Sequence, residues 1–295
     1  MRLFAAAISF VVLGVCAGCV AEPAPLEDRT AQESLALDLD LPTTGLTLEI
    51  DGSVAASLTS FAHGNAKLGD VRATFNLSET NALLDWLGAI GSKETVHHDG
   101  AIYGLNAKGE RRRVDFTGLL LTEVSFPALD AKDGKKHLEV TVKFKPEEIK
   151  YSSGGGKLSK LTEPAPLTYR VSIPGIPAEY VVKVEPTKLT PKIVESTSGG
   201  RLPTQHYASW SCSDLRIEFG GGGGDAAAAL AKKILDDGVI SEAEFVDVMI
   251  DLLDASSKVV ATMKVRAPKK SAKSVATATL EFMVEEFSFK AAHQG

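Results

Sequence analysis

Alternating apolar and polar residues dominate the chain from residue 46 onward, and this pattern predicts β-strands. The first run, residues 46–50, alternates as a strand with one buried face does, and Asp51 with Gly52 supplies a turn after it. Two strand-length stretches, residues 101–105 and 111–116, flank a polar turn and predict a hairpin. Residues 138–151 predict one long closing strand.

The hydrophobic period changes to that of a helix after the first strands. Leu83, Trp86 and Leu87 recur at helical spacing, Ser78 is a candidate N-cap, and Gly91 is a candidate stop. Trp86 lies on the apolar face and is expected in the core. The order of strands, one helix and further strands predicts an α+β domain, mainly β, in which the helix packs on an antiparallel sheet.

The second half of the chain repeats this order. Residues 153–166 contain Gly, Ser and Pro and predict a linker. After it, a predicted strand ends two residues before Gly175, as the first one ends two residues before Gly52. Residues 226–235 form a second candidate helix.

The best internal match lies in the closing strands. Residues 142–151 and 280–289 align with Phe, Glu and Glu in register and with apolar residues at both ends. The turn at residues 105–110 has a counterpart at residues 253–258. These matches in the same order predict a tandem duplication. The predicted domains are sandwich-like or barrel-like, each with one flanking helix, and span residues 45–152 and 167–290.

One segment of the second half fits two structures. Ser241 and Glu244 form a capping box ahead of apolar residues at helical spacing, whereas residues 246–252 also alternate as a strand does. The duplication favours a strand over residues 249–253, because the equivalent part of the first half precedes a hairpin turn.

Residues 1–19 have the composition of an export signal. Arg2 supplies a positive charge, and residues 3–15 form an uncharged apolar run, shorter than the ~20 residues of a membrane-spanning helix. Two small residues and Cys19 follow, which resembles the cleavage site of bacterial lipoproteins and implies lipidation of Cys19. Cys16 stands where those signals usually have Leu, so a plain signal peptide or an uncleaved anchor is the alternative.

Residues 20–44 are rich in Pro and acidic residues and predict a tether. The protein is therefore expected to be exported and membrane-anchored at the bacterial cell envelope. With Cys19 lipidated, Cys212 is the other cysteine of the exported chain, so no internal disulfide is expected. Cys212 lies in a strand-like run and is expected as a small buried residue, because no activating base is marked near it.

Composition and motifs favour a non-enzymatic protein. The net charge of -6 argues against a protein that binds nucleic acid through its phosphates. His97, His98 and Asp99 are the one compact group of metal-ligand types, but neighbours on a strand point to opposite faces. The glycine run at residues 220–224 ends in Asp225 and lacks the Lys of a phosphate-binding loop. No cofactor, metal or catalytic residue is therefore predicted.

Two kinds of charged residue are candidates for contacts between subunits. Alternation places Arg111 and Arg113 on one strand face and Arg112 on the other, either in solvent or against an acidic partner or lipid head group. The neighbouring carboxylates in each closing strand face opposite ways and cannot act together on one bond. Their repetition indicates an architectural or subunit-contact role. The candidate contact residues are Glu147, Glu148, Glu285, Glu286, Arg111 and Arg113.

The order of elements resembles the tail-tube proteins of contractile phages and related injection machines. In the first half the resemblance rests on residues 84–87, 99–110, 114–116 and 126–149, and it extends to residues 48–52. The second half is similar more loosely, through residues 250–260 and the final strand. The resemblance implies a sandwich-like or barrel-like fold with one helix. It also implies subunits that join their sheet edges around a ring of six and stack into a tube.

Two functions follow from this resemblance. In the leading interpretation, the protein is a structural, membrane-anchored tube-like subunit that self-associates, with two domains per chain giving a trimer of pseudo-sixfold symmetry. Tube subunits carry no export signal, so the alternative is a monomeric envelope lipoprotein that uses the same fold to bind a protein partner of unknown identity. An enzyme would need a pocket that gathers distant residues such as His97 and Cys212.

Overall fold

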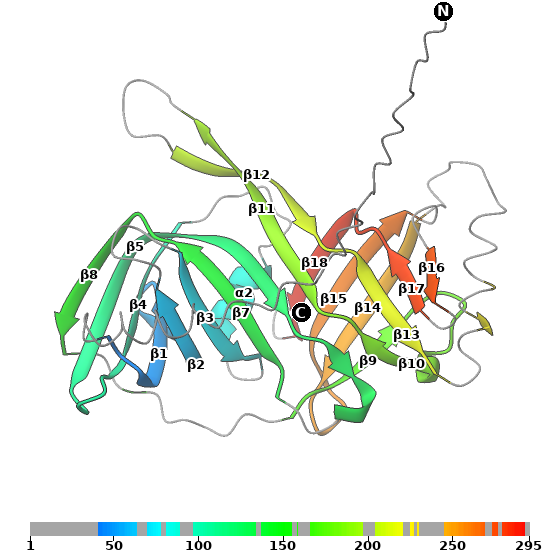
Figure 1. Ribbon diagram of the computed structural model, residues 1–295, viewed down its shortest axis with the longest axis horizontal. Coiled ribbons are helices and arrows are strands. Elements are labelled where there is room, and N and C mark those ends of the chain that lie inside the picture. Colours follow the sequence, from blue (N-terminus) through cyan, green and yellow to red (C-terminus); the bar gives the residue numbers. More distant parts are fainter. Residues whose placement is uncertain are drawn as a thin grey trace, which may run out of the picture.

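The computed structural model describes residues 41–63, 70–77, 81–88, 97–133, 137–154, 158, 166–196, 204–220, 225–226, 229, 245–268, 273–276 and 279–292. Strands account for 70% of the structure and helices for 8%, which confirms the predicted mainly-β class. Figure 1 shows a barrel built from the first half of the chain beside the sheets of the second half. The division into two domains and a helix flanking each one stay predictions.

The first half runs from β1 to β8. Its elements are β1 (Thr44–Ile50), β2 (Ser53–His63), β3 (Val71–Asn76), α2 (Asn81–Gly88), β4 (His98–Leu105), β5 (Arg111–Phe126), β6 (Leu129–Asp130), the short helix η2 (Ala131–Asp133), β7 (Glu139–Lys145) and β8 (Glu148–Ser153).

The second half runs from β9 to β18. Its elements are β9 (Thr168–Ser172), the short helix η3 (Ala178–Tyr180), β10 (Val181–Val184), β11 (Thr187–Ser196), β12 (Thr204–Cys212), β13 (Leu215–Phe219), β14 (Phe245–Leu253), β15 (Val259–Pro268), β16 (Lys273–Ala276), β17 (Thr279–Phe282) and β18 (Glu286–Ala291).

Six strands of the first half close into a barrel in the order β5-β4-β1-β2-β3-β7, with β7 pairing back to β5. Alternation in these strands places one set of side chains inside, where Leu48, Ile102 and Phe144 are almost fully buried. Close approach of β4 to β1 needs small residues, since a Cβ on Gly104 would lie 2.6 Å from the carbonyl oxygen of Thr44. The barrel interior is thus filled by the apolar residues of the alternating pattern, and glycine allows β4 to approach β1.

The predicted single closing strand, residues 138–151, is wrong in one respect. It consists of two strands, β7 and β8, separated at Pro146 and Glu147. Pro146 has no N–H to donate to a ladder, so the strand breaks there. β7 pairs with β3 and with the second part of β5, whereas β8 pairs with the first part of β5.

The predicted helix is present as α2. Leu83 and Leu87 are fully buried, and Trp86 stacks on Phe144 at a centroid distance of 4.9 Å. The expectation that Trp86 belongs to the core is therefore confirmed. The candidate cap and stop of this helix, Ser78 and Gly91, lie outside the described residues, as does most of the second candidate helix at residues 226–235.

Strands β11 and β12 extend the nine-stranded sheet of the barrel, and the other strands of the second half form two further sheets, one of which includes β6 of the first half. One has the order β16-β17-β13-β10-β6 and the other the order β18-β15-β14-β9. The ambiguous segment is a strand in the described part: β14 begins at Phe245 and alternates in burial to Leu253. The preference for a strand over residues 249–253 is confirmed, whereas Ser241 and Glu244 lie outside the described residues.

Strand pairings recur in the same order in the two halves. The series β1–β4, β4–β5 and β5–β8 corresponds to β9–β14, β14–β15 and β15–β18. The series β2–β3 and β3–β7 corresponds to β10–β13 and β13–β17. The registers agree as well: Val114 lies opposite Tyr151, and Met263 opposite Phe289. Val114 and Met263 are equivalent because they lie opposite Ile102 and Ile250, and the sequence alignment of the closing strands likewise matches Tyr151 with Phe289.

The turns that follow β4 and β14 are also alike. The side-chain oxygen of Asn106 accepts hydrogen bonds from the N–H groups two and four residues later, at 3.0 and 2.7 Å. Asp254 does the same at 2.8 and 2.9 Å. Gly109 and Ser257, each three residues after that side chain, both have a left-handed backbone, with φ of 77° and 61°. The same local chemistry therefore builds both hairpins.

Candidate functional site

The junction between the two halves is made by strands that cross from one half to the other. The end of β5 pairs with the start of β11, where Val124 lies opposite Leu189 and Phe126 opposite Thr187. The short strand β6 pairs with β10, where Leu129 lies opposite Val184. The predicted linker therefore separates the halves in sequence, while their backbones join on both sides of Pro127 and Ala128.

Aromatic side chains fill the junction. Phe126 lies 6.0 Å from Phe287 and 5.9 Å from Phe289, measured between ring centroids. Helix α2 of the first half also contacts β18 of the second. Apolar residues of both halves belong to one continuous core, so the halves bury surface against each other as the layers of one domain do.

A partly buried carboxylate joins three strands at this junction. Glu123 on β5 lies 3.1 Å from Nζ of Lys143 on β7 and 3.0 Å from Nζ of Lys188 on β11. Burial alone would raise the pKa of Glu123, but the hydrogen bonds from Lys188 and Lys143 outweigh it and hold the pKa below its usual value. Glu123 is therefore ionised at neutral pH.

The β11–β12 hairpin extends from the junction past the barrel (Figure 1). The hydroxyl of Tyr207 donates to the carbonyl of Leu121 at 2.9 Å, and a ring nitrogen of His97 lies 3.3 Å from the carbonyl oxygen of Gln205. These contacts hold the first half of β12 against β5 and against the residue that precedes β4. β12 is the edge strand of the nine-stranded sheet.

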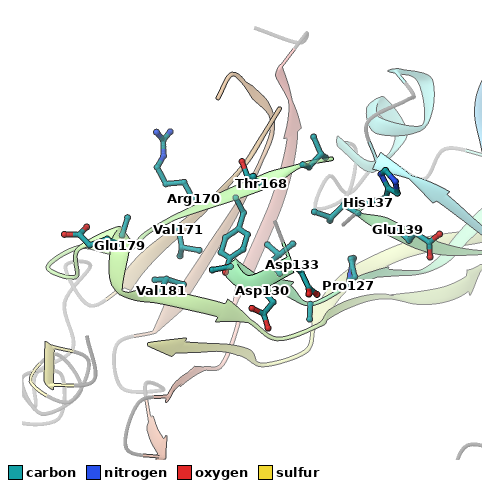
Figure 2. Close-up of a pocket in the computed structure, with 17 residues that line it drawn as sticks. Pro127, Asp130, Asp133, His137, Glu139, Thr168, Arg170, Val171, Glu179 and Val181 are labelled. Atoms are coloured by element: carbon teal, nitrogen blue, oxygen red, sulfur yellow. The ribbon is translucent and has the colours of Figure 1, made fainter. Parts of the chain in front are cut away.

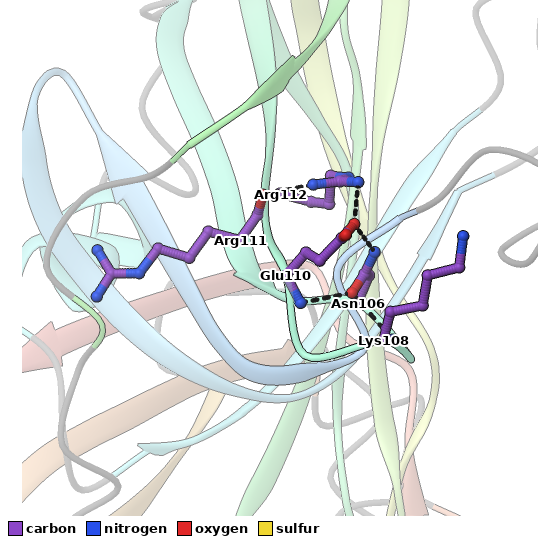
Figure 3. Close-up of polar contacts among 5 residues, drawn as sticks. All are labelled: Asn106, Lys108, Glu110, Arg111 and Arg112. Carbon is purple, nitrogen blue, oxygen red and sulfur yellow. Dashed lines mark hydrogen bonds and ion pairs between the residues drawn. The ribbon is translucent and has the colours of Figure 1, made fainter.

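Arg111 and Arg113 do not act as a pair. Arg113 lies 2.9 Å from Glu49 and 2.6 Å from Asp115, and its hydrogen bond to Glu49 raises the pKa of the guanidinium above its ordinary value. Its charge is thus neutralised within the chain. Arg111 is exposed, and Figure 3 shows it pointing away from the network that joins Arg112 and Glu110.

The four predicted contact glutamates are exposed. Glu148 pairs with Lys150 at 3.5 Å, and Glu286 pairs with Arg266 at 3.6 Å. The structure brings none of these carboxylates into a common site. Their role as subunit contacts, including that of Glu147 and Glu285, stays a prediction.

The adjacent histidines contact different partners. Nδ1 of His98 lies 2.6 Å from Asp51, and the His98 ring meets Trp86 edge to face. Nδ1 of His97 lies 3.7 Å from Glu147, beyond hydrogen-bond distance. Asp99 instead accepts from the N–H of Gly118 at 3.0 Å. The side chains therefore diverge as alternation predicts, and within the described part of the chain no three His, Cys, Asp or Glu residues could hold a metal.

Cys212 is half-buried at the end of β12. Burial, followed by the charge of Asp214, raises the pKa of the thiol to about 12. A thiol with this pKa is protonated at neutral pH and is a poor nucleophile. The expectation of a small, unreactive strand residue agrees with this environment.

A pocket that no sequence motif marks lies between the halves. It has a volume of about 520 Å³ and is lined by β6, η2, the start of β7, β9 and η3. Figure 2 shows Glu179 and Glu139 at opposite ends of this pocket, with Asp130 and Asp133 between them. No motif marks these residues, and the paired acids at positions 130 and 133 after a proline were the sole local signal.

No protein-family model matches the chain, and no curated protein matches it. Within the described residues, no helix has the length and apolar character needed to cross a membrane. The predicted signal, the lipidation site Cys19 and most of the tether lie outside the described residues, so these expectations stay predictions.

Proposed function

We propose that the protein is a non-enzymatic, membrane-anchored assembly protein that resembles a phage tail-tube subunit and joins its copies head to tail. The contact between its two halves carries this proposal. The first half contributes β6 and the end of β5, and the second half contributes β10 and β11. The two halves therefore use different surfaces for the contact although they resemble each other. A heterologous contact of this kind can be repeated between successive units, so that they form a ring or a filament.

The shared pairings and turns support treating each half as one repeat of a tandem duplication. In the shared register, Leu58 and Phe61 of β2 correspond to Val181 and Val184 of β10, because their partners on β3 and β13 correspond. The junction surface of β10 therefore has a counterpart on β2.

That counterpart is an open edge in the described part of the chain. Residues 60–62 of β2 pair with β3 on one side, and no described strand pairs with them on the other, where β10 has β6. An open strand edge carries N–H and C=O groups that favour pairing with another chain. If this edge of β2 pairs with the second repeat of the next copy, three chains supply six repeats and close a ring.

The anchor is part of the proposal. The lipoprotein-like signal, with Cys19 as the lipidated residue, and the acidic tether after it support a ring held at the surface of a bacterial envelope membrane.

Light scattering on residues 20–295 over a range of concentrations tests the assembly. A trimer, or stacks of trimers, is the expected result. A monomer at every concentration would overturn ring formation and favour the monomeric binding module.

A variant tests the proposed edge. Ser60 is exposed on β2, and Ser60→Lys places on this edge the charge with which natural proteins block edge pairing. We expect it to shift the trimer to a monomer. The control Ser256→Lys adds the same charge in an exposed turn and should leave the trimer intact.

A further inference from the structure

We propose that the pocket between the two halves binds an organic amine, that is, an apolar body carrying at least one ammonium group. The pocket exists because β6 of the first half pairs with β10 of the second, which places η2 opposite η3 and β9. Its volume of about 520 Å³ lies within the range of sites for small organic molecules, roughly 300–1,000 Å³.

The base of the pocket is apolar. Leu129, Leu138, Leu167, Val171 and Val181 line it, and each is at most 7% exposed. Water against such a surface makes few hydrogen bonds, so an apolar ligand body that displaces it is favoured. The pocket therefore suits a ligand with a hydrocarbon part rather than a bare ion.

The charges around the opening select a cation. Asp130, Asp133, Glu139 and Glu179 contribute four carboxyl groups to the lining. The one arginine in the lining, Arg170, lies 2.7 Å from Asp251 on β14, which offsets its charge. A cavity lined by one sign of charge raises the local concentration of ligands of the other sign.

Tyr169 lines the pocket close to the negative charge of Asp130. Its hydroxyl donates to the carbonyl of Val182 at 2.9 Å, which holds the side chain in place at the pocket. Burial, and then the negative charge of Asp130, raise the pKa of Tyr169 to about 12. The negative potential of Asp130 thus reaches the inside of the pocket.

The arrangement of the acids disfavours a metal ion. Figure 2 shows the carboxylates spread along the pocket, and among the described residues no three His, Cys, Asp or Glu residues could hold one ion. A divalent cation needs several oxygen ligands at once. An amine fits better, because one ammonium group needs only one or two carboxylates and its apolar body fills the rest.

Two fluorescent probes that differ in charge test the proposal on the full chain. Dansylcadaverine has an aromatic body and a free primary amine, and its N-acetyl derivative has the same body without the charge. We expect one dansylcadaverine to bind per chain, at least tenfold more tightly than the acetylated probe. Its affinity should fall as the salt concentration is raised. Equal affinity of the two probes, or no binding of either, would overturn the proposal.

Variants place the binding at this pocket. Asp130→Asn with Glu139→Gln should weaken the binding of dansylcadaverine about tenfold and leave the binding of the acetylated probe unchanged. The local turn should be kept, because the side-chain oxygen of the new amide can still accept from the N–H of Lys132, which lies 2.8 Å from Asp130. Thr168→Trp, at an exposed lining position, should weaken both probes. The control Glu148→Gln with Glu195→Gln removes two charges that do not line the pocket. The assignment would be contradicted if the control variant bound dansylcadaverine as weakly as the pocket variant does. It would also be contradicted if Thr168→Trp bound both probes with unchanged affinity.

The site is independent of the proposed assembly. One probe per chain is expected in a trimer and in a monomer alike, so a monomeric protein that binds the amine would overturn the ring and leave the pocket standing.

Discussion

Glu147 and Glu285 occupy the same position in the two halves of the chain. The N–H of Glu147 donates to the carbonyl of Thr117 at 2.9 Å, and the N–H of Glu285 donates to the carbonyl of Arg266 at 3.0 Å. Each bond lies at the bend between two consecutive strands, β7 to β8 and β17 to β18. The repeated glutamates therefore mark a backbone feature of the fold, and their exposed side chains remain open to other roles.

Strands β4 and β1 approach so closely that Gly104 should not tolerate substitution by a larger residue. A Cβ at residue 104 would lie 2.6 Å from the Thr44 carbonyl oxygen, and the backbone of β1 cannot move without opening the barrel. Gly104→Ala should lower the free energy of unfolding by about 2–3 kcal/mol, as overpacking of a core does. Urea denaturation followed by circular dichroism measures it.

Gly109→Ser is the matched control. Gly109 has open space around it, and the equivalent Ser257 already has φ of 61°. Gly109→Ser should lower the free energy of unfolding by less than about 1 kcal/mol, the usual size of the effect of replacing one glycine that has a left-handed backbone. A loss as large as that of Gly104→Ala would mean that the second-half turn is a poor guide to the first.

The ion pairs of Glu123 predict a pH-dependent junction. A carboxyl whose pKa is lower in the folded than in the unfolded chain stabilises the fold above its unfolded pKa, about 4.3, and this stability is lost as pH falls through the folded pKa. Glu123→Gln should therefore cost about 1 kcal/mol at pH 7. The difference from the unchanged protein should shrink as the pH falls below about 4.

Denaturant unfolding at pH 7 and at pH 3 checks this prediction. Glu148→Gln is the control, since Glu148 pairs with Lys150 in an exposed position. It should change stability little at either pH. A pH-independent effect of Glu123→Gln would show that packing, rather than charge, is what Glu123 contributes.

The aromatic contact across the junction predicts that the halves depend on each other. Phe126 is 2% exposed and meets both Phe287 and Phe289. Phe126→Ala should cost about 3–5 kcal/mol, the usual range for a buried phenylalanine. Probes of either half should report the loss in one transition. Two separate transitions, with one half unaffected, would contradict a shared core.

Cys212 should react slowly with thiol reagents. A pKa of about 12 leaves a thiolate fraction at pH 8 that is roughly a thousandfold lower than that of a free cysteine with a pKa of about 8.5. In residues 20–295, where Cys212 is the sole cysteine, labelling by Ellman's reagent should be at least about 100-fold slower than in guanidinium chloride. Rapid labelling of the folded protein would mean that the thiol is open to solvent and ionised.

Much of the local structure could be predicted from the sequence because local patterns determine it. Alternation located strands of the barrel, and Trp86 belongs to the core as expected. The break at Pro146 was also readable, since a proline cannot continue a paired strand, yet the apolar pattern on both sides concealed it.

The tertiary structure alone decided how the halves join. The pairings of β5 with β11 and of β6 with β10 use backbone N–H and C=O groups, which every residue type carries and which leave no mark in the side-chain pattern. The pocket follows from those pairings, because Asp130 and Tyr169 meet across the junction although nothing in their local sequence relates them. The sequence by itself thus determined the repeated strands and turns through alternation, glycine and short-range hydrogen bonds. The crossing strands and the acidic pocket were decided by long-range backbone pairing.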